Sequence, residues 1–315
     1  MRVMLIVNPT ATAVTPRRVG EVLHVLGRRH EVTVAETSER GDAARIARAS
    51  ADAGSSGIIV LGGDGTLNEA ANGIVGSEVV LAPLPGGSTN VFARSIGLPR
   101  RMLDAAGSVS DALSAGRSQR IGVGRVQADD RDPRVFVCHL GIGWDASLVA
   151  EVERHRRLER RATVALYTWA GLRTFVGYGD RRRPRLVASS GDEHVSGCFT
   201  LVQNSDPYTS VGPLPLRVAP SADRHGGLAA TTLATLTAPV LLRALAAAAT
   251  GRGVRAGPSI RVSSDLDSIT VRSRGVGDDE DPLPYQIDGD HMGDARIIAI
   301  DRVSDALRVI DPTSR

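Results

Sequence analysis

The chain has 315 residues, enough for two domains with their own cores, and its apolar content of 42% and charged content of 23% are those of a soluble globular protein. All of its basic residues are arginine, which excludes mechanisms that need a catalytic lysine. A net charge of only +3 and an aromatic content of 3% argue against a nucleic-acid partner.

Strands and helices alternate through the first 115 residues. Short apolar runs predict strands at residues 3–7, 31–36, 58–61 and 79–83. Apolar residues on one helical face predict helices at residues 16–28, 42–53, 67–74, 91–96 and 102–115. This alternation with short connections predicts a doubly wound parallel sheet, in which ligands bind at the carboxyl ends of the strands.

The third predicted strand leads into a glycine-rich loop, LGGDGT, and then into a helix with Thr66 as a candidate cap. Such a turn lets the backbone approach a ligand, and free N–H groups at the helix start favour an anion. Asp64 inside this loop is a candidate ligand for a Mg²⁺ that bridges phosphates. The loop lacks the Lys-Ser/Thr of a P-loop and is not a GxGxxG fingerprint, so a tight turn without a ligand is the alternative.

The fourth predicted strand leads into a second glycine loop, with the sequence LPGGSTNVFAR over residues 84–94. Ser88 and Asn90 offer a hydroxyl and an amide to a phosphate or a base, although a plain turn explains the pattern equally well. Asn8, Thr37 and the polar residues of both glycine loops all follow predicted strands. We therefore expect them to lie together at the carboxyl edge of the sheet.

The pattern of apolar residues changes after Ser118. Alternating runs predict an antiparallel sheet domain, with strands at residues 120–127, 134–140, 185–189, 195–203, 216–220, 259–262, 268–274, 285–288 and 295–302. Two helical segments interrupt it, at residues 147–175 and at 239–250, the second between Thr237 as N-cap and Gly251 as C-cap. Residues 306–310 are a candidate last strand that returns to the first domain.

Two acidic positions in this second half have both a structural and a functional interpretation. Asp145 opens the first long helix, where it is either an N-cap or a residue that faces a cleft. Asp288 and Asp290 flank Gly289 at a strand end, so they either form a hairpin turn or supply a base for a substrate hydroxyl. The arginine runs at residues 154–161 and 181–185 fit a solvated face or a membrane surface, and the acidic tract at 278–281 fits a solvated loop.

Taken together and in this order, these motifs resemble the diacylglycerol kinase family of bacterial lipid kinases, which includes relatives of sphingosine kinase. The resemblance runs from Asn8-Pro9 and the Gly41-Asp42-Ala43 segment, through both glycine loops and residues 141–146, to Asp288-Gly289-Asp290. The GGDGT element alone is shared with NAD kinases. The later motifs are those of the lipid kinases.

The resemblance implies an N-terminal α/β domain, residues 1–118 completed by 303–315, and a C-terminal antiparallel β-sandwich, residues 119–302, with ATP in the cleft. It implies ATP and Mg²⁺ as cofactors, Asp64 as the metal ligand, and a lipid hydroxyl as acceptor, most simply that of diacylglycerol at a membrane surface. Asp288 would take the hydroxyl proton with Asp290 beside it, or their roles would be reversed. The implied nucleotide contacts are Asn8, Pro9, Thr10, Ala11, Thr12, Thr37, Gly62, Gly63, Asp64, Gly65, Thr66, Leu67, Asn68, Glu69, Gly87, Ser88 and Asn90.

The sequence also departs from the family pattern. The first loop, NPTAT, lacks the usual Ser-Gly, Asp290 stands where Glu is usual, and residues 224–230 read RHGGLAA instead of a DDGLLD-like segment that holds a structural Mg²⁺. An NAD kinase and a non-catalytic nucleotide or lipid binder are the alternatives. The short N-terminal apolar run, the lack of an apolar stretch of about 20 residues and the two motif-free cysteines predict a cytoplasmic protein. The lipid substrate that the resemblance implies leaves a peripheral position at the inner face of the membrane open. A homodimer is left open.

Overall fold

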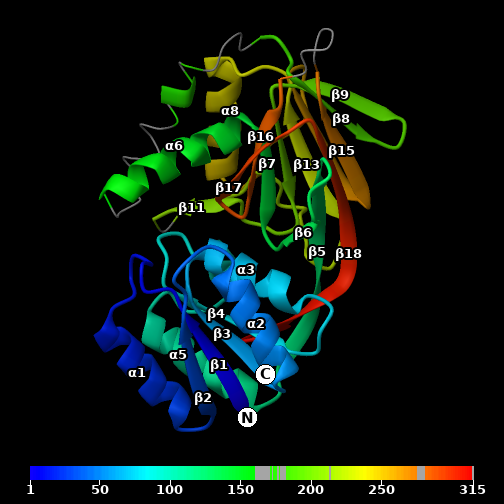
Figure 1. Cartoon of the computed structure of the whole chain (residues 1–315). Helices are drawn as coiled ribbons and strands as arrows, with labels where there is room; N and C mark the ends of the chain where they lie inside the picture. Colours follow the sequence, from blue (N-terminus) through cyan, green and yellow to red (C-terminus); the bar gives the residue numbers. More distant parts are fainter. Residues whose placement is uncertain are drawn as a thin grey trace. The chain divides into compact units, whose positions relative to one another are not determined.

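The computed structural model describes residues 1–159, 171, 173–175, 177, 182–212, 214–274 and 281–313 (Figure 1). The chain forms two compact units, residues 1–123 with 304–315 and residues 124–303. Two strands, β5 (Ser118–Ala128) and β18 (Ile297–Ile310), contribute residues to both units. The expected domain boundary near Ser118 therefore falls at the start of β5, five residues before the first unit ends at Val123.

The first unit contains a parallel sheet with the strand order β2-β1-β3-β4-β18. Every residue of the two central strands β3 and β4 is buried, which explains why their sequences are continuous apolar runs instead of alternating ones. The edge strand β2 is mostly exposed. The bounds of the first four strands are β1 (Arg2–Val7), β2 (Glu31–Glu36), β3 (Gly57–Gly62) and β4 (Val80–Pro85).

Helices cover both faces of this sheet, so the fold is doubly wound as predicted. Helix α1 packs with α5 on one side and α2 packs with α3 on the other (Figure 1). Right-handed connections require this arrangement, because the chain steps one way across the sheet from β1 to β2 and the opposite way from β2 to β3. Helix α1 starts at Pro16 because Thr15 caps it, its hydroxyl accepting from the Arg18 N–H. The helices are α1 (Pro16–Gly27), α2 (Asp42–Asp52), α3 (Asp64–Ile74), α4 (Val91–Ser95) and α5 (Met102–Ser114).

The start of α3 differs from the prediction. The helix begins at Asp64 with Gly63 as its N-cap, so Thr66 lies inside the first turn and caps nothing. The Thr66 hydroxyl instead accepts a hydrogen bond from the Asn8 amide, 2.9 Å away. The expected cap was wrong because a tertiary contact uses the hydroxyl that the local sequence offered for capping.

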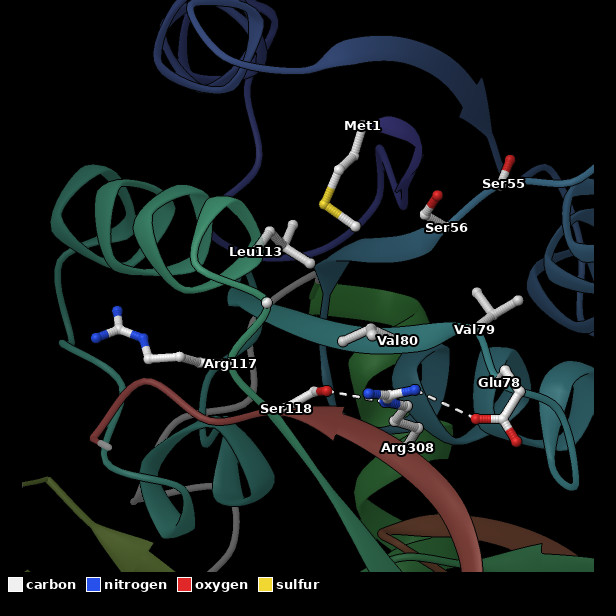
Figure 2. A pocket seen from close by; sticks show the side chains of 11 residues that line it. Met1, Ser55, Ser56, Glu78, Val79, Val80, Leu113, Arg117, Ser118 and Arg308 are labelled. Atoms are coloured by element: carbon white, nitrogen blue, oxygen red, sulfur yellow. Dashed lines mark hydrogen bonds and ion pairs between the residues drawn. The ribbon is translucent and has the colours of Figure 1, made fainter. Parts of the chain in front are cut away.

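A pocket of about 340 Å³ lies at the amino-terminal edge of the sheet (Figure 2). Residues at or just before the starts of four strands and at the end of α5 line much of it: Met1, Ser55, Ser56, Val79, Val80, Leu113 and Ser118. Arg308 forms a charged wall, since its side chain donates to the Ser118 hydroxyl and pairs with Glu78. Ligands of open α/β sheets bind at the other edge, so this pocket is not where we place the nucleotide.

The second unit is a β-sandwich made of two antiparallel sheets. One has the strand order β14-β13-β10-β7-β16-β17, and the other contains β18-β15-β8-β9 with β5 and β6 joined to β18. A separate hairpin pairs β11 with β12. The bounds are β6 (Arg134–Phe136), β7 (His139–Gly143), β8 (Leu186–Ser190), β9 (Glu193–Gly197), β10 (Phe199–Gln203), β11 (Thr209–Val211), β12 (Leu214–Leu216), β13 (Leu228–Leu233), β14 (Ile260–Leu266), β15 (Ser268–Ser273), β16 (Leu283–Ile287) and β17 (Asp290–Ala295).

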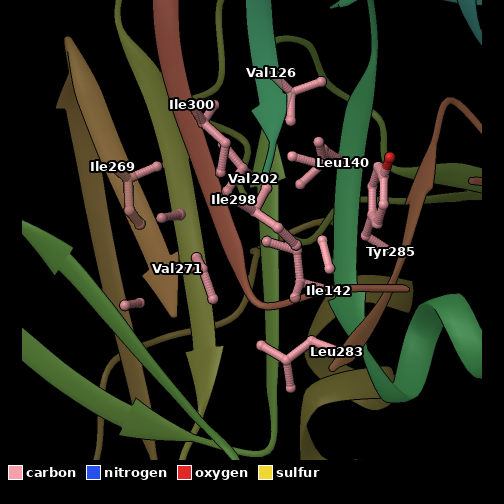
Figure 3. Packing of buried hydrophobic residues seen from close by; sticks show 14 of the residues in the cluster. Val126, Leu140, Ile142, Val202, Ile269, Val271, Leu283, Tyr285, Ile298 and Ile300 are labelled. Atoms are coloured by element: carbon pink, nitrogen blue, oxygen red, sulfur yellow. The ribbon is translucent and has the colours of Figure 1, made fainter. Parts of the chain in front are cut away.

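The core of this unit lies between its two sheets. Figure 3 shows Leu140, Ile142 and Val202 from one sheet facing Val271 and Ile298 from the other. Alternation along the strands supplies these residues, because every second side chain points to the same face. The antiparallel sandwich predicted for the second half is therefore confirmed.

Several strand predictions in this unit need correction. The run predicted at residues 134–140 is two strands, because the chain turns at Val137 and Cys138 between β6 and β7. The run at 195–203 likewise divides at Cys198, residues 217–220 form no strand, and β13 was missed because its small residues give no alternation. Residues 297–310 form one long strand, β18, where two were expected.

Two helices are described in the second unit, α6 (Trp144–Glu159) and α8 (Ala238–Ala249). Thr237 is the N-cap of α8, as predicted, and Gly251 follows its C-cap in a left-handed conformation. Within the rest of the predicted helix 147–175, residues 171 and 173–175 are helical as well, and residues 160–170 and 172 lie outside the described residues. Parts of the arginine runs 154–161 and 181–185 and of the acidic tract 278–281 also lie outside them. Among the described helices, none combines the length and apolarity that crossing a bilayer requires.

Candidate functional site

The loops that follow β1, β3 and β4 are hydrogen-bonded to one another at the carboxyl edge of the parallel sheet. The Asn8 side-chain amide donates to the Thr66 hydroxyl of α3. The Ala13 N–H donates to the Gly86 carbonyl, and the Gly86 N–H donates to the Gly62 carbonyl, both at 2.9 Å. The three loops that the sequence singled out therefore form one structure, although no two of them are adjacent in the chain.

Glycine is required where the second and third of these loops touch. A Cβ on Gly87 would lie 2.7 Å from the Gly63 Cα, and a Cβ on Gly86 would lie 2.9 Å from the Gly62 nitrogen. Both contacts are with backbone atoms, which cannot swing away. At these positions the glycines bring two backbones together, a use different from the ligand approach that the sequence suggested.

Asp64 joins the two glycine loops. One of its carboxylate oxygens accepts from the Thr89 hydroxyl and the Val91 N–H, and the other accepts from the Phe92 N–H, all at 3.0–3.1 Å. It thereby satisfies free N–H groups at the start of α4. Burial raises the pKa of Asp64, and these hydrogen bonds and the charge of Arg94 oppose that rise.

The amino end of α3 fits an anion. Its N-cap is Gly63, which provides no side-chain hydrogen bond, so the N–H groups of the first turn have no side-chain acceptor. The helix dipole points its positive end at the same place. Ser88 in the neighbouring loop is exposed, so its hydroxyl faces solvent at this edge of the sheet. Phosphate groups are the ligands that such an arrangement favours.

Some of the predicted contact residues instead hold the loops in shape. The Asn8 carbonyl oxygen accepts from both the N–H and the hydroxyl of Thr10. Asn90 is in the left-handed conformation, and its side chain both accepts from the Gly87 N–H and donates to the Gly87 carbonyl. The Thr37 N–H donates to the Val7 carbonyl, which places Thr37 beside the end of β1.

The other predicted contact residues differ in how far they are exposed to solvent. Pro9, Thr10 and Thr12 are exposed, whereas Ala11 and Gly62 are buried and Gly65 is half-buried. Leu67 is 2% exposed and its N–H bonds to the Gly63 carbonyl, so it is a core residue, and the expected ligand contact at Leu67 stays a prediction. Asn68 and Glu69 are also buried, and the Asn68 side chain accepts from Asn72 of the same helix.

In the second unit, Asp288 is held by a cradle of backbone amides. Its carboxylate accepts from the N–H groups of Val137, Cys138 and His139, each at 2.8 Å, and its own N–H donates to the His139 carbonyl. The break between β6 and β7 turns these amides toward it. Asp288 is 4% exposed and has a φ of 48°. It is the corner of the β16–β17 hairpin as well as the predicted base, so neither interpretation of the sequence excludes the other.

Asp290 lies two residues further on, as the first residue of β17. It is half-buried, whereas Asp288 is buried. Its position just past the hairpin corner makes it the more accessible carboxylate of the predicted pair.

Asp145 forms a buried polar group with Tyr208 and Gln286. Its carboxylate accepts from the Tyr208 hydroxyl at 2.5 Å and from the Gln286 side-chain amide at 2.9 Å, and burial raises its pKa. The Gln286 carbonyl oxygen accepts from the Gly289 N–H at 2.8 Å, so the group reaches the Asp288–Asp290 turn. Asp145 is the second residue of α6, not its N-cap, so the N-cap interpretation is wrong.

The sequence analysis missed Gln286 and Tyr208 of this group and the neighbouring His139. Gln286 lies between Tyr285 and Ile287, which both face the sandwich core, so its place in a predicted strand next to Asp288 was a usable signal. Tyr208 and His139 gave no such signal. The two rings meet edge to face with centroids 4.7 Å apart, and burial lowers the pKa of His139 to about 4. Among the described residues, no three His, Cys, Asp or Glu side chains group as a metal site.

Comparison with known proteins points to one family. The sequence profile of the diacylglycerol kinase catalytic domain matches residues 2–126. A diacylglycerol kinase of Mycobacterium tuberculosis is 29% identical over 196 residues, which is 61% of this chain and 59% of that protein. The diacylglycerol kinase of Bacillus subtilis is 34% identical over 130 residues, 40% of this chain and 42% of that protein. The match thus spans about three fifths or less of these relatives.

Solved structures share the fold along nearly the whole chain. A Bacillus anthracis protein superposes with a TM-score of 0.72 at 20% identity, covering 98% of this chain and 96% of its own. The crystal structure of a diacylglycerol kinase from the same organism gives a TM-score of 0.68 at 18% identity with the same coverage. The glycine loops and the helix start that we single out lie inside the matched catalytic domain. Residues 2–126 of this chain therefore match the diacylglycerol kinase catalytic domain, and the chain as a whole shares its fold with the Bacillus anthracis structures.

Proposed function

We propose that this protein is an ATP- and Mg²⁺-dependent lipid kinase that phosphorylates diacylglycerol to phosphatidic acid. The observation that carries the proposal is the amino end of α3, whose N–H groups have no side-chain cap and lie between two fused glycine loops at the carboxyl edge of the sheet. Relatives named diacylglycerol kinases support diacylglycerol as the acceptor, while other relatives are named only probable lipid kinases. A membrane lipid as substrate would place the protein at the inner face of the membrane.

The phosphates of ATP fit the residues present. First-turn N–H groups of α3 would donate to them, with the exposed Ser88 and Thr12 at the loop surfaces. For Mg²⁺ the fit is narrower, because three donors already occupy the Asp64 carboxylate and one acceptor position remains on the oxygen that binds the Phe92 N–H. That oxygen would be the ligand that the protein provides to Mg²⁺. This fits the usual coordination of Mg²⁺ by one or two carboxylates together with phosphates and water. When bound, the ion supplies neutralisation of the phosphate charge.

We assign different roles to the two acids of the hairpin turn. Asp288 has three backbone N–H groups on its carboxylate, which fix its position and hold the turn in shape. Asp290 is the accessible neighbour, so it would take the proton of the lipid hydroxyl as that oxygen bonds to the γ-phosphorus and the bond from phosphorus to ADP breaks. Phosphoryl transfer needs positioning more than a strong base, so an ordinary aspartate is sufficient.

Asp145 would act as a positioning residue for the same turn. It holds the Gln286 amide nitrogen, and the Gln286 carbonyl oxygen in turn holds the Gly289 N–H between the two acids. These two hydrogen bonds would fix the backbone of the turn at Gly289 and, through it, the orientation of Asp290.

The test is phosphoryl transfer from labelled ATP with Mg²⁺ to a panel in detergent micelles: diacylglycerol, monoacylglycerol, ceramide and sphingosine, with NAD as the soluble control. We expect labelled phosphatidic acid, and its loss in Asp290→Asn. Label on another lipid would keep the mechanism and change the substrate, and label on NAD alone would identify an NAD kinase. ATP binding by calorimetry with no labelled product would identify a non-catalytic binder.

A further inference from the structure

Helix α8 of the second unit is apolar on the side that faces solvent. One side packs against the core around Phe199 and Leu201 through Val240, Ala244 and Ala247, which recur at helical spacing. On the other side, Leu242 is 66% exposed and Leu245 is 47% exposed. A surface helix ordinarily carries polar residues there. The only charged residue in all of α8 is Arg243, which is also exposed.

The β11–β12 hairpin adds to this apolar surface. Val211 is 41% exposed and Leu214 is 46% exposed, so the hairpin and α8 hold four of the large apolar side chains that are exposed among the described residues. The hairpin lies beside α8, because β12 packs on the helix and the Arg217 N–H that follows β12 donates to the Ala248 carbonyl (Figure 1). Exposed apolar side chains on two adjacent elements indicate a contact surface, where single ones do not.

The chain segment between Asp206 and Asp265 is rich in arginine. Residues 207–264, which include the hairpin and α8, contain six arginines and a single acid, Asp223. Arg243, Arg252 and Arg255 are exposed, on α8 itself and in the loop that follows it. We call the four exposed apolar residues, Val211, Leu214, Leu242 and Leu245, together with these three arginines, the α8 surface.

We propose that the α8 surface seats the second unit on an anionic lipid bilayer. Leucine and valine side chains would enter the boundary between head groups and acyl chains, and the arginines would reach lipid phosphates while their aliphatic stems stay with the apolar side chains. A second copy of this chain is a poorer partner, because a two-fold interface would place like-charged arginines opposite one another. The inference rests on the proposed function, which already places the protein at a membrane, and deepens it by assigning the surface that contacts the bilayer.

Vesicle flotation of the full-length protein without ATP tests this proposal. We expect binding to vesicles of phosphatidylcholine with 30% phosphatidylglycerol and much weaker binding to pure phosphatidylcholine. Leu242→Ser combined with Leu245→Ser should weaken binding to the anionic vesicles at least tenfold. Arg243→Gln should weaken it about fivefold, as expected for one charge near an anionic surface.

The matched control is Leu103→Ser on α5, an exposed leucine (38%) in the first unit, which should leave vesicle binding unchanged. The substituted leucines are exposed, so circular dichroism and thermal melting should match those of the unsubstituted protein. Equal binding by the double leucine variant, or no binding to anionic vesicles, would overturn the proposal. So would a concentration-dependent dimer in sedimentation that the leucine substitutions abolish. Because no ATP is present, failure of the kinase assignment leaves this result unaffected.

Discussion

Replacing Asp288 by asparagine should destabilise the second unit rather than only remove a catalytic group. Three backbone N–H groups meet the Asp288 carboxylate, two on one oxygen and one on the other. Asparagine keeps one acceptor oxygen and places an NH₂ group where the other was, so at least one buried N–H loses its partner. Asparagine tolerates the left-handed backbone as well as aspartate does, so the change isolates the hydrogen bonds.

The expected loss is about 3–5 kcal/mol. A hydrogen bond to a charged group contributes about 1.5–3 kcal/mol, and a buried N–H without an acceptor costs about 1–3 kcal/mol more. Urea unfolding followed by circular dichroism gives the free energy of unfolding by linear extrapolation. Hydrogen exchange at the amides of residues 137–139 gives an independent reading, because these amides lose protection first if the carboxylate holds them.

Asp290→Asn is the matched control, two residues away in the same turn. It should lower the free energy of unfolding less than Asp288→Asn does, because Asp290 is half-buried where Asp288 is buried, yet remove most of the turnover. The reasoning fails if Asp288→Asn is as stable as the unsubstituted protein, or if Asp290→Asn destabilises it equally. Full turnover in Asp290→Asn would return the role of base to Asp288.

Three further predictions follow from the geometry. Gly87→Ala would press a Cβ against the Gly63 Cα, so we expect the free energy of unfolding to fall by about 1–3 kcal/mol in thermal or urea unfolding. ATP binding measured by calorimetry should weaken at least tenfold. Gly63→Ala is the control and should keep its stability, because its Cβ would lie 3.7 Å from the Gly87 Cα, an ordinary contact distance. Asp64→Asn removes the carboxylate that caps α4, so unfolding should cost about 1–2 kcal/mol less, and unchanged stability would contradict the observed cap. The pKa of His139 is about 4 in the folded protein and 6.5 is its ordinary value, so the unfolded chain binds the proton more readily; stability should therefore be full above pH 6.5 and fall by up to about 1.4 kcal/mol per pH unit as the pH drops toward 4. His139→Gln should flatten that part of the pH profile, and an unchanged profile would show that another group causes it.

The elements of the first unit could be predicted almost residue by residue because each one is encoded locally. Continuous apolar runs predict β3 and β4, and the helical spacing of Val22 and Leu26 predicts the buried face of α1. The start of α3 was placed three residues late because the hydrogen bond from Asn8 to Thr66 comes from a loop 58 residues away. In the second unit the local signal is weaker. Strand β13 consists of small buried residues, and the break between β6 and β7 exists because Asp288, some 150 residues later, binds the amides at that point.

The candidate site divides in the same way. The glycine loops and the Asp288–Asp290 turn were visible in the sequence because glycine and paired acids at strand ends are unusual there. The partners of these residues were not visible: the backbone contact of Gly87 with Gly63, the capping of α4 by Asp64, and the link from Asp145 through Gln286 to Gly289 all join distant segments.

The sequence by itself determined the order of elements, the parallel sheet and the resemblance to the diacylglycerol kinase family, because periodicity and turn chemistry are local properties of the chain. Only the tertiary structure decided what the polar residues do. Asp64 caps α4 and Asp288 anchors a turn because other segments bring N–H donors to their carboxylates. The role of base that we propose for Asp290 rests on its greater exposure. The exposure of Leu242 and Leu245 is likewise a tertiary fact, because an apolar helix has the same sequence pattern whether a core or a membrane covers its second face.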